Sequence, residues 1–287
     1  MALHPLPLVA GSRQQADEWA LALTSAGVSS RIEADHEGWR LLVETEDAPR
    51  ATAILEAYVE ENAPVEPAAE LHDAGPSSVP VILALALFAF WVVTGPRDAG
   101  AGWFEHGSAN SARLLNGQLW RSITALTLHA DLAHVLANAV GLIVFTGGLC
   151  RAFGSGVALW LLLLSGGAGN LLNALLRGPG HSAVGASTAV FGAVGALAAA
   201  QAVSRRRRRG GHAPAWLPVA AGLALLALLG SAAHTDVLAH LFGFVAGLIA
   251  GAVAATRLPR PPEPGTQRWL GLLATATVVA AWAAAMG

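Results

Sequence analysis

Seven apolar segments follow one another between residues 79 and 286, and they constrain the fold of this chain more than any other feature. A membrane-spanning helix needs about 20 mostly apolar residues, with a range of roughly 17–25. Every one of the seven segments meets this range, several of them near its lower limit. The sequence therefore predicts an all-α bundle of seven membrane-spanning helices at residues 79–95, 129–148, 155–176, 185–203, 216–232, 236–256 and 269–286.

Charge is distributed unevenly along the chain. Fourteen of the 19 acidic residues precede position 75, and all 17 basic residues are arginine, as in proteins of GC-rich bacterial genomes. Charged residues make up 13% of the chain, against roughly 25% in soluble domains. The net charge of −2 gives no reason to expect a nucleic-acid partner. The single cysteine, Cys150, excludes an internal disulfide framework and any multi-cysteine metal site.

Residues 1–62 have the pattern of a small soluble α/β domain. Short apolar runs at 6–10, 28–32 and 39–43 predict strands, and the segments 14–25 and 49–61 predict helices. This βαββα order loosely resembles a ferredoxin-like regulatory domain found on some bacterial membrane proteins. We expect a cytoplasmic adaptor or regulatory domain that could form a homo-oligomer. The Pro- and Ala-rich residues 63–78 are interpreted as a linker.

Arginine placement predicts the orientation in the membrane. With the first domain inside the cell, the inner loops carry nine arginines and the outer loops carry four, in agreement with the positive-inside rule. The run of five arginines at 205–209 is interpreted as a topology anchor rather than a patch for lipid or nucleic acid. The long outer loop, 96–128, has aromatic residues that favour a segment lying in the membrane interface. We expect a multi-pass protein of a bacterial inner membrane.

Four polar residues from three expected spans fall at a similar depth. His134 and Asn138, Ser187, and His240 all occur early in spans that run from outside to inside. At 1.5 Å per residue they lie on the order of 3–14 Å below the outer boundary. Because polar side chains inside a bilayer are costly, each indicates a functional site by default.

Ser187 and His240 together indicate a nucleophile and its base. Ser187 falls in the first turn of its helix, where unpaired backbone N–H groups and the helix dipole favour an oxyanion. Taken singly, each has a structural interpretation: Ser187 as a packing residue, His240 as a partner for a buried carbonyl. At matching depth, the general-base role of His240 becomes the better explanation. Asp236 is expected to cap the helix of His240, so the sequence predicts a dyad rather than a triad.

His134 and Asn138 are spaced i, i+4 and therefore face the same way. An imidazole N–H and an amide N–H are donors suited to an oxyanion hole. Hydrogen bonds between helices are the structural alternative, and both could hold. His129 lies above them and is expected to brace the interface loop.

These residues together resemble the rhomboid family of intramembrane serine proteases. The resemblance covers roughly residues 80–256, and no single motif in it is as specific as the set. The motifs are Gly185-Ala186-Ser187 with Phe191 and Gly192, Asp236 to His240 with Gly243 and Gly247, His129 with His134 and Asn138, and Trp120-Arg121 in the long loop.

The resemblance implies a role for each site residue. Ser187 is the nucleophile and His240 the general base. His134, Asn138 and the Ser187 backbone N–H form the oxyanion hole, and Phe191 packs on the His240 ring. Gly185, His129 and Gly243 support the site. Thr188 departs from the family pattern, which has glycine there, and this affects the local fit of the substrate or the oxyanion loop.

The resemblance also implies the reaction and the architecture. A peptide bond in or near a transmembrane segment of a membrane protein is hydrolysed through an acyl-enzyme, with no metal or cofactor, on the extracytoplasmic side. Residues 79–256 form the six-helix core, and residues 257–287 add a loop and a seventh helix.

Two other classes of protein were weighed. A zinc metalloprotease is disfavoured because the sequence has no His-Glu-x-x-His helix. A transporter or a catalytically inactive rhomboid-like chaperone is the other alternative, but transporters usually have internal repeats or broken helices. The one interruption, residues 166–170, is interpreted as close packing against the span at 185–203.

Overall fold

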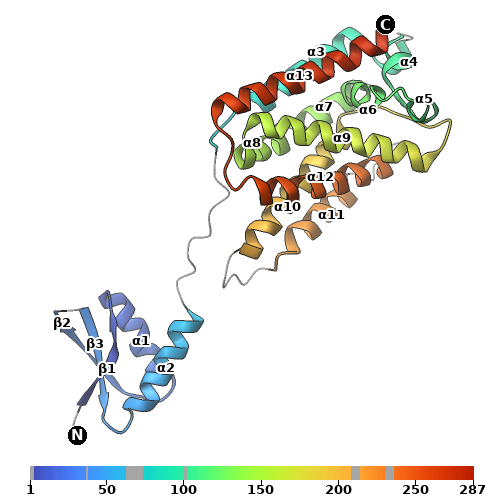
Figure 1. Cartoon of the computed structure of the whole chain (residues 1–287). Helices are drawn as coiled ribbons and strands as arrows, with labels where there is room; N and C mark the ends of the chain where they lie inside the picture. The colour runs from blue at the N-terminus through green and yellow to red at the C-terminus, as the bar shows by residue number, and fades with distance from the viewer. Residues whose placement is uncertain (1–2, 37, 63–73, 100–101, 208–213, 230–235) are drawn as a thin grey trace. The chain divides into compact units, whose positions relative to one another are not determined.

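The computed structural model of the chain describes residues 3–36, 38–62, 74–99, 102–207, 214–229 and 236–287 (Figure 1). The chain divides into two compact units, Met1–Glu66 and Pro67–Gly287. Several expectations fall wholly or partly outside the described residues. They concern most of the linker 63–78, the end of the arginine run 205–209 and the end of the segment 216–232.

The N-terminal unit contains its strands and helices in the expected βαββα order. Its three strands form an antiparallel sheet in the order β1-β3-β2. Both helices contribute to one buried cluster with the sheet, which includes Leu23, Leu55 and Leu41. Its similarity to a ferredoxin-like domain stays a prediction. The elements are β1 Leu3–Ala10, α1 Arg13–Ser25, β2 Ser30–Asp35, β3 Gly38–Glu44 and α2 Ala48–Glu61.

The second unit is a bundle of apolar helices. Five helical stretches are long and apolar enough to cross a membrane, among them the continuous stretch Leu132–Phe153, in which a π-helical segment joins two α-helices. The helices are α3 Val79–Thr94, α7 Leu132–Gly141, η3 Leu142–Thr146, α8 Gly147–Phe153, α9 Ser155–Arg177, α10 Ser187–Arg207, α11 Leu217–Leu229, α12 Val237–Arg257 and α13 Pro264–Met286.

Two of the seven expected spans contain helices that are short within the described residues. Helix α3 has 16 residues, and α11 has 13 up to Leu229, the last described residue of its segment. At 1.5 Å per residue, these helices are about 24 Å and about 20 Å long, less than the roughly 30 Å of a bilayer core. The structure thus supports a multi-pass membrane protein with five candidate spans, and the count of seven stays a prediction.

The loop between α3 and α7 folds into short elements. It contains η1 Arg97–Ala99, α4 Trp103–Gly107, β4 Ala109–Asn110, α5 Ser111–Leu115, α6 Arg121–Thr124 and η2 Ala125–Thr127. Buried Arg121 holds the loop together by donating to the carbonyls of Glu105 and Ser108. Strand β4 pairs with β5, Ser182–Ala183, which lies just before α10. The loop is therefore attached to the segment that leads into Ser187.

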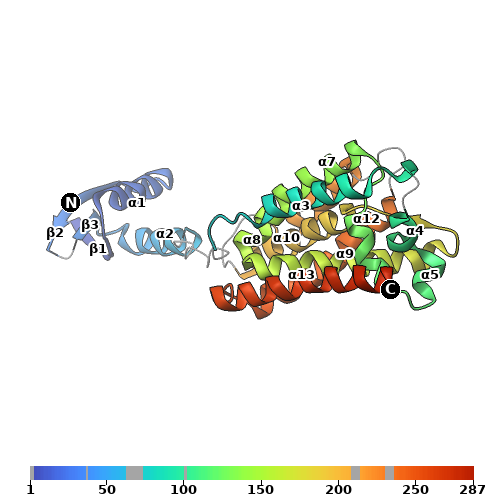
Figure 2. The same cartoon turned by 90° about the horizontal axis from the view of Figure 1, so that it is seen from above.

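Helix α10 lies in the interior of the bundle and packs closely on α12 and α9 (Figure 2). A Cβ atom added at Gly195 or Gly247 would overlap backbone atoms of the facing helix. Small residues of this kind let transmembrane helices approach closely. The expected packing of residues 166–170 on α10 is present, because Gly166 faces Ala189. This close packing places the beginning of α10 beside the beginning of α12.

Candidate active site

Ser187 and His240 lie within hydrogen-bonding distance. Ser187 is the first residue of α10, and His240 lies in the first turn of α12. The distance between His240 Nε2 and Ser187 Oγ is 2.8 Å, and the histidine is only 5% exposed. Nucleophile and base must be within this reach for proton transfer. The arrangement can activate a serine hydroxyl inside an apolar bundle.

Gly185 makes the turn into α10 and leaves room for His134. Its φ of +122° lies in the region that favours glycine. A Cβ atom at this position would lie 2.6 Å from His134 Nε2 and 3.6 Å from Ser187 Oγ. The His134 ring therefore sits beside the serine, against the turn. Unpaired backbone N–H groups of the first turn of α10 lie at the same place.

His129 holds the turn that precedes Ser187. It lies before α7, is fully buried, and accepts a hydrogen bond at Nε2 from the backbone N–H of Ala186, 3.2 Å away. Burial, together with the neighbouring His134, lowers the pKa of His129 to about 3. The ring is thus neutral and can act as an acceptor. The sequence predicted that His129 braces the interface loop. In the structure it also braces the 185–187 turn, and its role towards the interface loop stays a prediction.

Asn138 lies one turn deeper than His134, as the i, i+4 spacing predicted. Its Nδ2 donates to the His134 carbonyl at 2.8 Å, which leaves one amide hydrogen uncommitted. Its Oδ1 is buried, with no hydrogen-bond partner in the part of the chain that the structure describes. The oxyanion role of His134 and Asn138 stays a prediction.

Phe191 packs on the His240 ring, one turn after Ser187. The two ring centroids are 4.7 Å apart with an angle of 34° between the planes. An aromatic ring in this position restricts the imidazole to orientations that face the serine. This contact agrees with the packing that the sequence pattern implied.

Thr188 stands where the rhomboid pattern has glycine, and the residues around it leave room for its side chain. The side chain is 3% exposed, and its hydroxyl donates to Asn170 Oδ1 at 3.2 Å. The methyl group fills space left by Gly169 and Gly243, which have no side chains. Sequence reasoning gave Asn170 no role. The signal was available, because a polar residue at membrane depth indicates a function or a partner.

Asp236 joins three elements at the mouth of the site. It caps α12 by accepting from the Ala239 N–H, as expected. It also accepts from Asn173 Nδ2 at 2.6 Å and faces His181 Nε2 at 2.5 Å and Arg177 at 3.4 Å. Burial alone would raise the pKa of Asp236, but the hydrogen bonds from Asn173, Ala239 and His181 outweigh it and lower the pKa. Sequence reasoning missed these partners, which lie far away along the chain.

No group of three or more potential metal ligands gathers among the residues that the structure describes. Nothing in the described part supports the zinc metalloprotease alternative.

Comparison with known proteins identifies the family. Residues 116–257 match the family model described as the rhomboid domain. Over 171 residues the chain is 27% identical to putative rhomboid protease YdcA of Bacillus subtilis, covering 60% of this chain and 85% of that protein. It is 35% identical over 140 residues to RHOMBOID-like protein 1 of Arabidopsis thaliana, covering 49% and 36%, respectively.

A third relative, Rhomboid-like protease 3 of Toxoplasma gondii, is 40% identical over 93 residues, or 32% of this chain and 35% of that protein. The chain thus spans about a third of the length of the plant and Toxoplasma relatives. The matched region contains all four residues of the candidate site, Ser187, His240, His134 and Asn138. Residues 116–257 are a rhomboid domain, and through this domain the chain belongs to the rhomboid family.

Proposed function

We propose that this chain is an intramembrane serine endopeptidase that hydrolyses peptide bonds in or near the transmembrane segments of other membrane proteins. The observation that carries the proposal is the 2.8 Å contact between Ser187 Oγ and His240 Nε2 at the beginning of two apolar helices. Relatives named as rhomboid proteases support protease chemistry for the family.

The reaction follows from the positions of these groups. His240 Nε2 takes the proton of Ser187 as Oγ attacks the substrate carbonyl carbon. The resulting oxyanion is stabilised by N–H groups of the first turn of α10 and by His134, with Asn138 contributing its remaining amide hydrogen. His240 then protonates the leaving amine, which yields an acyl-enzyme. A water molecule, deprotonated by His240, hydrolyses the ester and restores the hydroxyl of Ser187.

The surroundings of the dyad support a membrane-protein substrate. The site lies in a bundle whose outer helices expose apolar side chains, so the enzyme and its substrate share the lipid bilayer. We further propose that the site opens on the extracytoplasmic side of the cell membrane and that the N-terminal unit is a cytoplasmic accessory domain able to form homo-oligomers.

Cleavage of a transmembrane substrate in proteoliposomes tests the function. Ser187→Ala and His240→Ala should each abolish cleavage and labelling by a fluorophosphonate probe. Ser165→Ala is a matched control, because Ser165 is a buried serine on α9 that donates to the Leu161 carbonyl. This control should cleave at the wild-type rate. Equal cleavage by wild type and Ser187→Ala would overturn the proposal, and a wild-type protein without activity or labelling would indicate a rhomboid-like protein with another role.

A further inference from the structure

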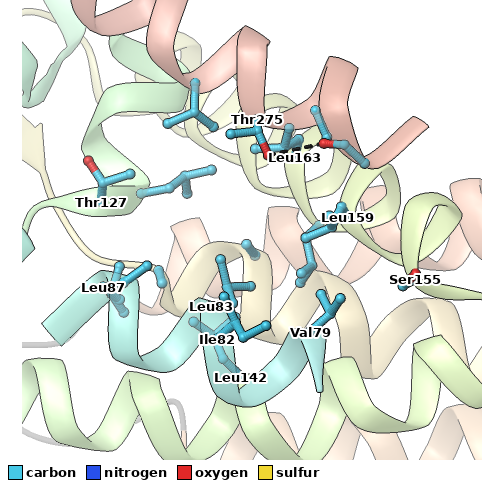
Figure 3. A pocket seen from close by; sticks show the side chains of 18 of the residues that line it. Val79, Ile82, Leu83, Leu87, Thr127, Leu142, Ser155, Leu159, Leu163 and Thr275 are labelled. Atoms are coloured by element: carbon cyan, nitrogen blue, oxygen red, sulfur yellow. Dashed lines mark hydrogen bonds between the residues drawn. The ribbon is translucent and has the colours of Figure 1, made fainter. Parts of the chain in front are cut away.

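An apolar cavity lies between α3 and α13. Its volume is about 820 Å³, and Figure 3 shows its walls. Helix α3 packs on α7 and η3, whereas α13 packs on α9, so a gap remains between them. Leu83 of α3 and Leu163 of α9 face the gap. The cavity extends inward to Ala186 and Ala189, on either side of the turn that carries the nucleophile.

Polar contacts fix α13 at both ends of this cavity. Near its start, buried Gln267 accepts at Oε1 from the Gly156 N–H, 2.7 Å away, and donates to the Phe153 carbonyl. Near its end, Trp282 donates to Thr127 Oγ1 at 3.0 Å. The gap between α3 and α13 is therefore set by bonded contacts.

The two ends of the cavity differ in chemistry. An aromatic cluster of Phe90, Trp103 and Trp282, with ring centroids 5.3–5.7 Å apart, closes the end near the interface loop. The opposite end carries the exposed guanidinium of Arg268. Among the described residues, no carboxylate pairs with this guanidinium. The cavity is thus an apolar slot with one closed end and one cationic end.

The walls and ends of the cavity favour a flexible hydrocarbon occupant. Water is a poor occupant, because it requires two to four polar partners and the walls are apolar. A spanning protein helix needs about 20 residues and is about 10 Å wide, so it would have to separate Phe90 from Trp282, whose rings are in contact at one end of the cavity. An acyl chain is thinner and can end at this contact.

The cationic end favours an anionic headgroup on that chain. Within residues 257–268 there are three arginines and one acidic residue, Glu263. Trp269, next to Arg268, is 69% exposed, as an aromatic residue at headgroup level would be. Basic pockets between transmembrane helices bind anionic lipid headgroups. We propose that this cavity binds an anionic phospholipid, with an acyl chain between α3 and α13 and its phosphate against Arg268.

Photo-cross-linking of the full chain in nanodiscs tests the site. The probe is phosphatidylglycerol with a diazirine on one acyl chain, compared with phosphatidylcholine that carries the same group. Mass spectrometry should find the phosphatidylglycerol label on α3, on α13 and around Leu163. Arg268→Gln should reduce the preference for phosphatidylglycerol about fivefold, since one arginine contributes about 1 kcal/mol at an anionic lipid. Arg260→Gln, which removes a charge outside the cavity lining, should change the preference less.

A second variant fills the cavity without disturbing the fold. Gly271 lines the cavity, and a Cβ atom there would make only an ordinary contact, 3.9 Å from Leu159. Gly271→Leu also improves helix propensity, so the variant should fold. It should abolish labelling of the cavity walls, whereas Gly265→Leu, outside the lining and in open space, should not. Equal labelling of Gly271→Leu and wild type would overturn the proposal. So would a result in which a transmembrane substrate peptide labels these walls and the lipid probe does not.

Discussion

Replacing Gly243 by alanine tests whether the close approach of α10 and α12 creates the dyad. Gly243 lies one turn after His240 on α12. A Cβ atom added there would overlap the carbonyl oxygen of Thr188 and lie 3.0 Å from Thr188 Cγ2. A backbone carbonyl and a β-branched side chain cannot swing aside. The two helices must therefore separate at the residue that follows Ser187.

The expected loss can be worked from this geometry. Cβ atoms in proteins essentially never lie closer than 3.0 Å to such a neighbour, so relieving the overlap moves α12 by on the order of 1 Å. Such a shift lengthens the Ser187–His240 contact from 2.8 Å to beyond about 3.5 Å, where it is no longer a hydrogen bond. A 1 Å misplacement can reduce activity about 10²-fold. Overpacking should also lower stability by about 1–3 kcal/mol.

Two measurements separate these effects. Cleavage of a transmembrane substrate gives kcat/KM, and the rate of fluorophosphonate labelling reports the reactivity of Ser187 alone. Thermal unfolding in detergent shows how much of the protein is folded at the assay temperature. Gly147→Ala serves as the control, because open space surrounds that glycine and the variant should match wild type. A folded Gly243→Ala protein with wild-type kcat/KM and labelling would refute the reasoning.

Three further predictions follow from the contacts around the dyad. Thr188→Val leaves Asn170 Oδ1 without its buried donor and should lower stability by about 1–3 kcal/mol, measured by thermal unfolding; an unchanged melting temperature would show that this bond adds nothing. The pKa of His129 is about 3 in the folded protein and about 6.5 in the unfolded chain, so the free energy of unfolding should fall by up to about 1.4 kcal/mol per pH unit as the pH drops from about 6.5 to about 3. Melting curves at several pH values should show a weaker pH dependence for His129→Gln. At neutral pH the lowered pKa of Asp236 keeps its carboxylate ionised, so Asp236→Asn should loosen the start of α12. The variant should lower kcat/KM for substrate cleavage more than it lowers binding of the fluorophosphonate probe. Equal kinetics for Asp236→Asn and wild type would contradict this.

The positions of the dyad could be predicted because depth in a membrane is nearly a one-dimensional quantity. Counting residues from the start of each apolar segment was enough to place Ser187 and His240 in one layer. The hydrogen bond between them agrees with that count. The count of seven spans stays a prediction: α3 has 16 residues and ends before Gly95, which has a φ of +70°, and α11 has 13 among the described residues.

Partner choice could not be predicted in the same way. The bonds of Asn170 to Thr188 and of Asp236 to Asn173 depend on which faces of α9, α10 and α12 meet, and no spacing along the chain encodes this. A hydrogen bond within a single helix was also not predicted. The shared face of His134 and Asn138 was predicted from their spacing, yet the Asn138 amide bonds to the carbonyl of its own preceding turn. Side-chain to backbone bonds of this kind are always available to asparagine within a helix.

The structural interpretation of this helix pair is compatible with the proposed function, because the same glycines serve both. The sequence offered close packing by small residues as the alternative to catalysis at Ser187. In the structure, Gly185 makes room for His134 beside the serine, and Gly243 lets α12 approach Thr188. A larger side chain at either position would overlap His134 or the Thr188 carbonyl, and both lie next to Ser187. Close packing therefore sets the Ser187–His240 distance, and the reactivity of Ser187 should respond to these glycines as well as to the polar residues themselves.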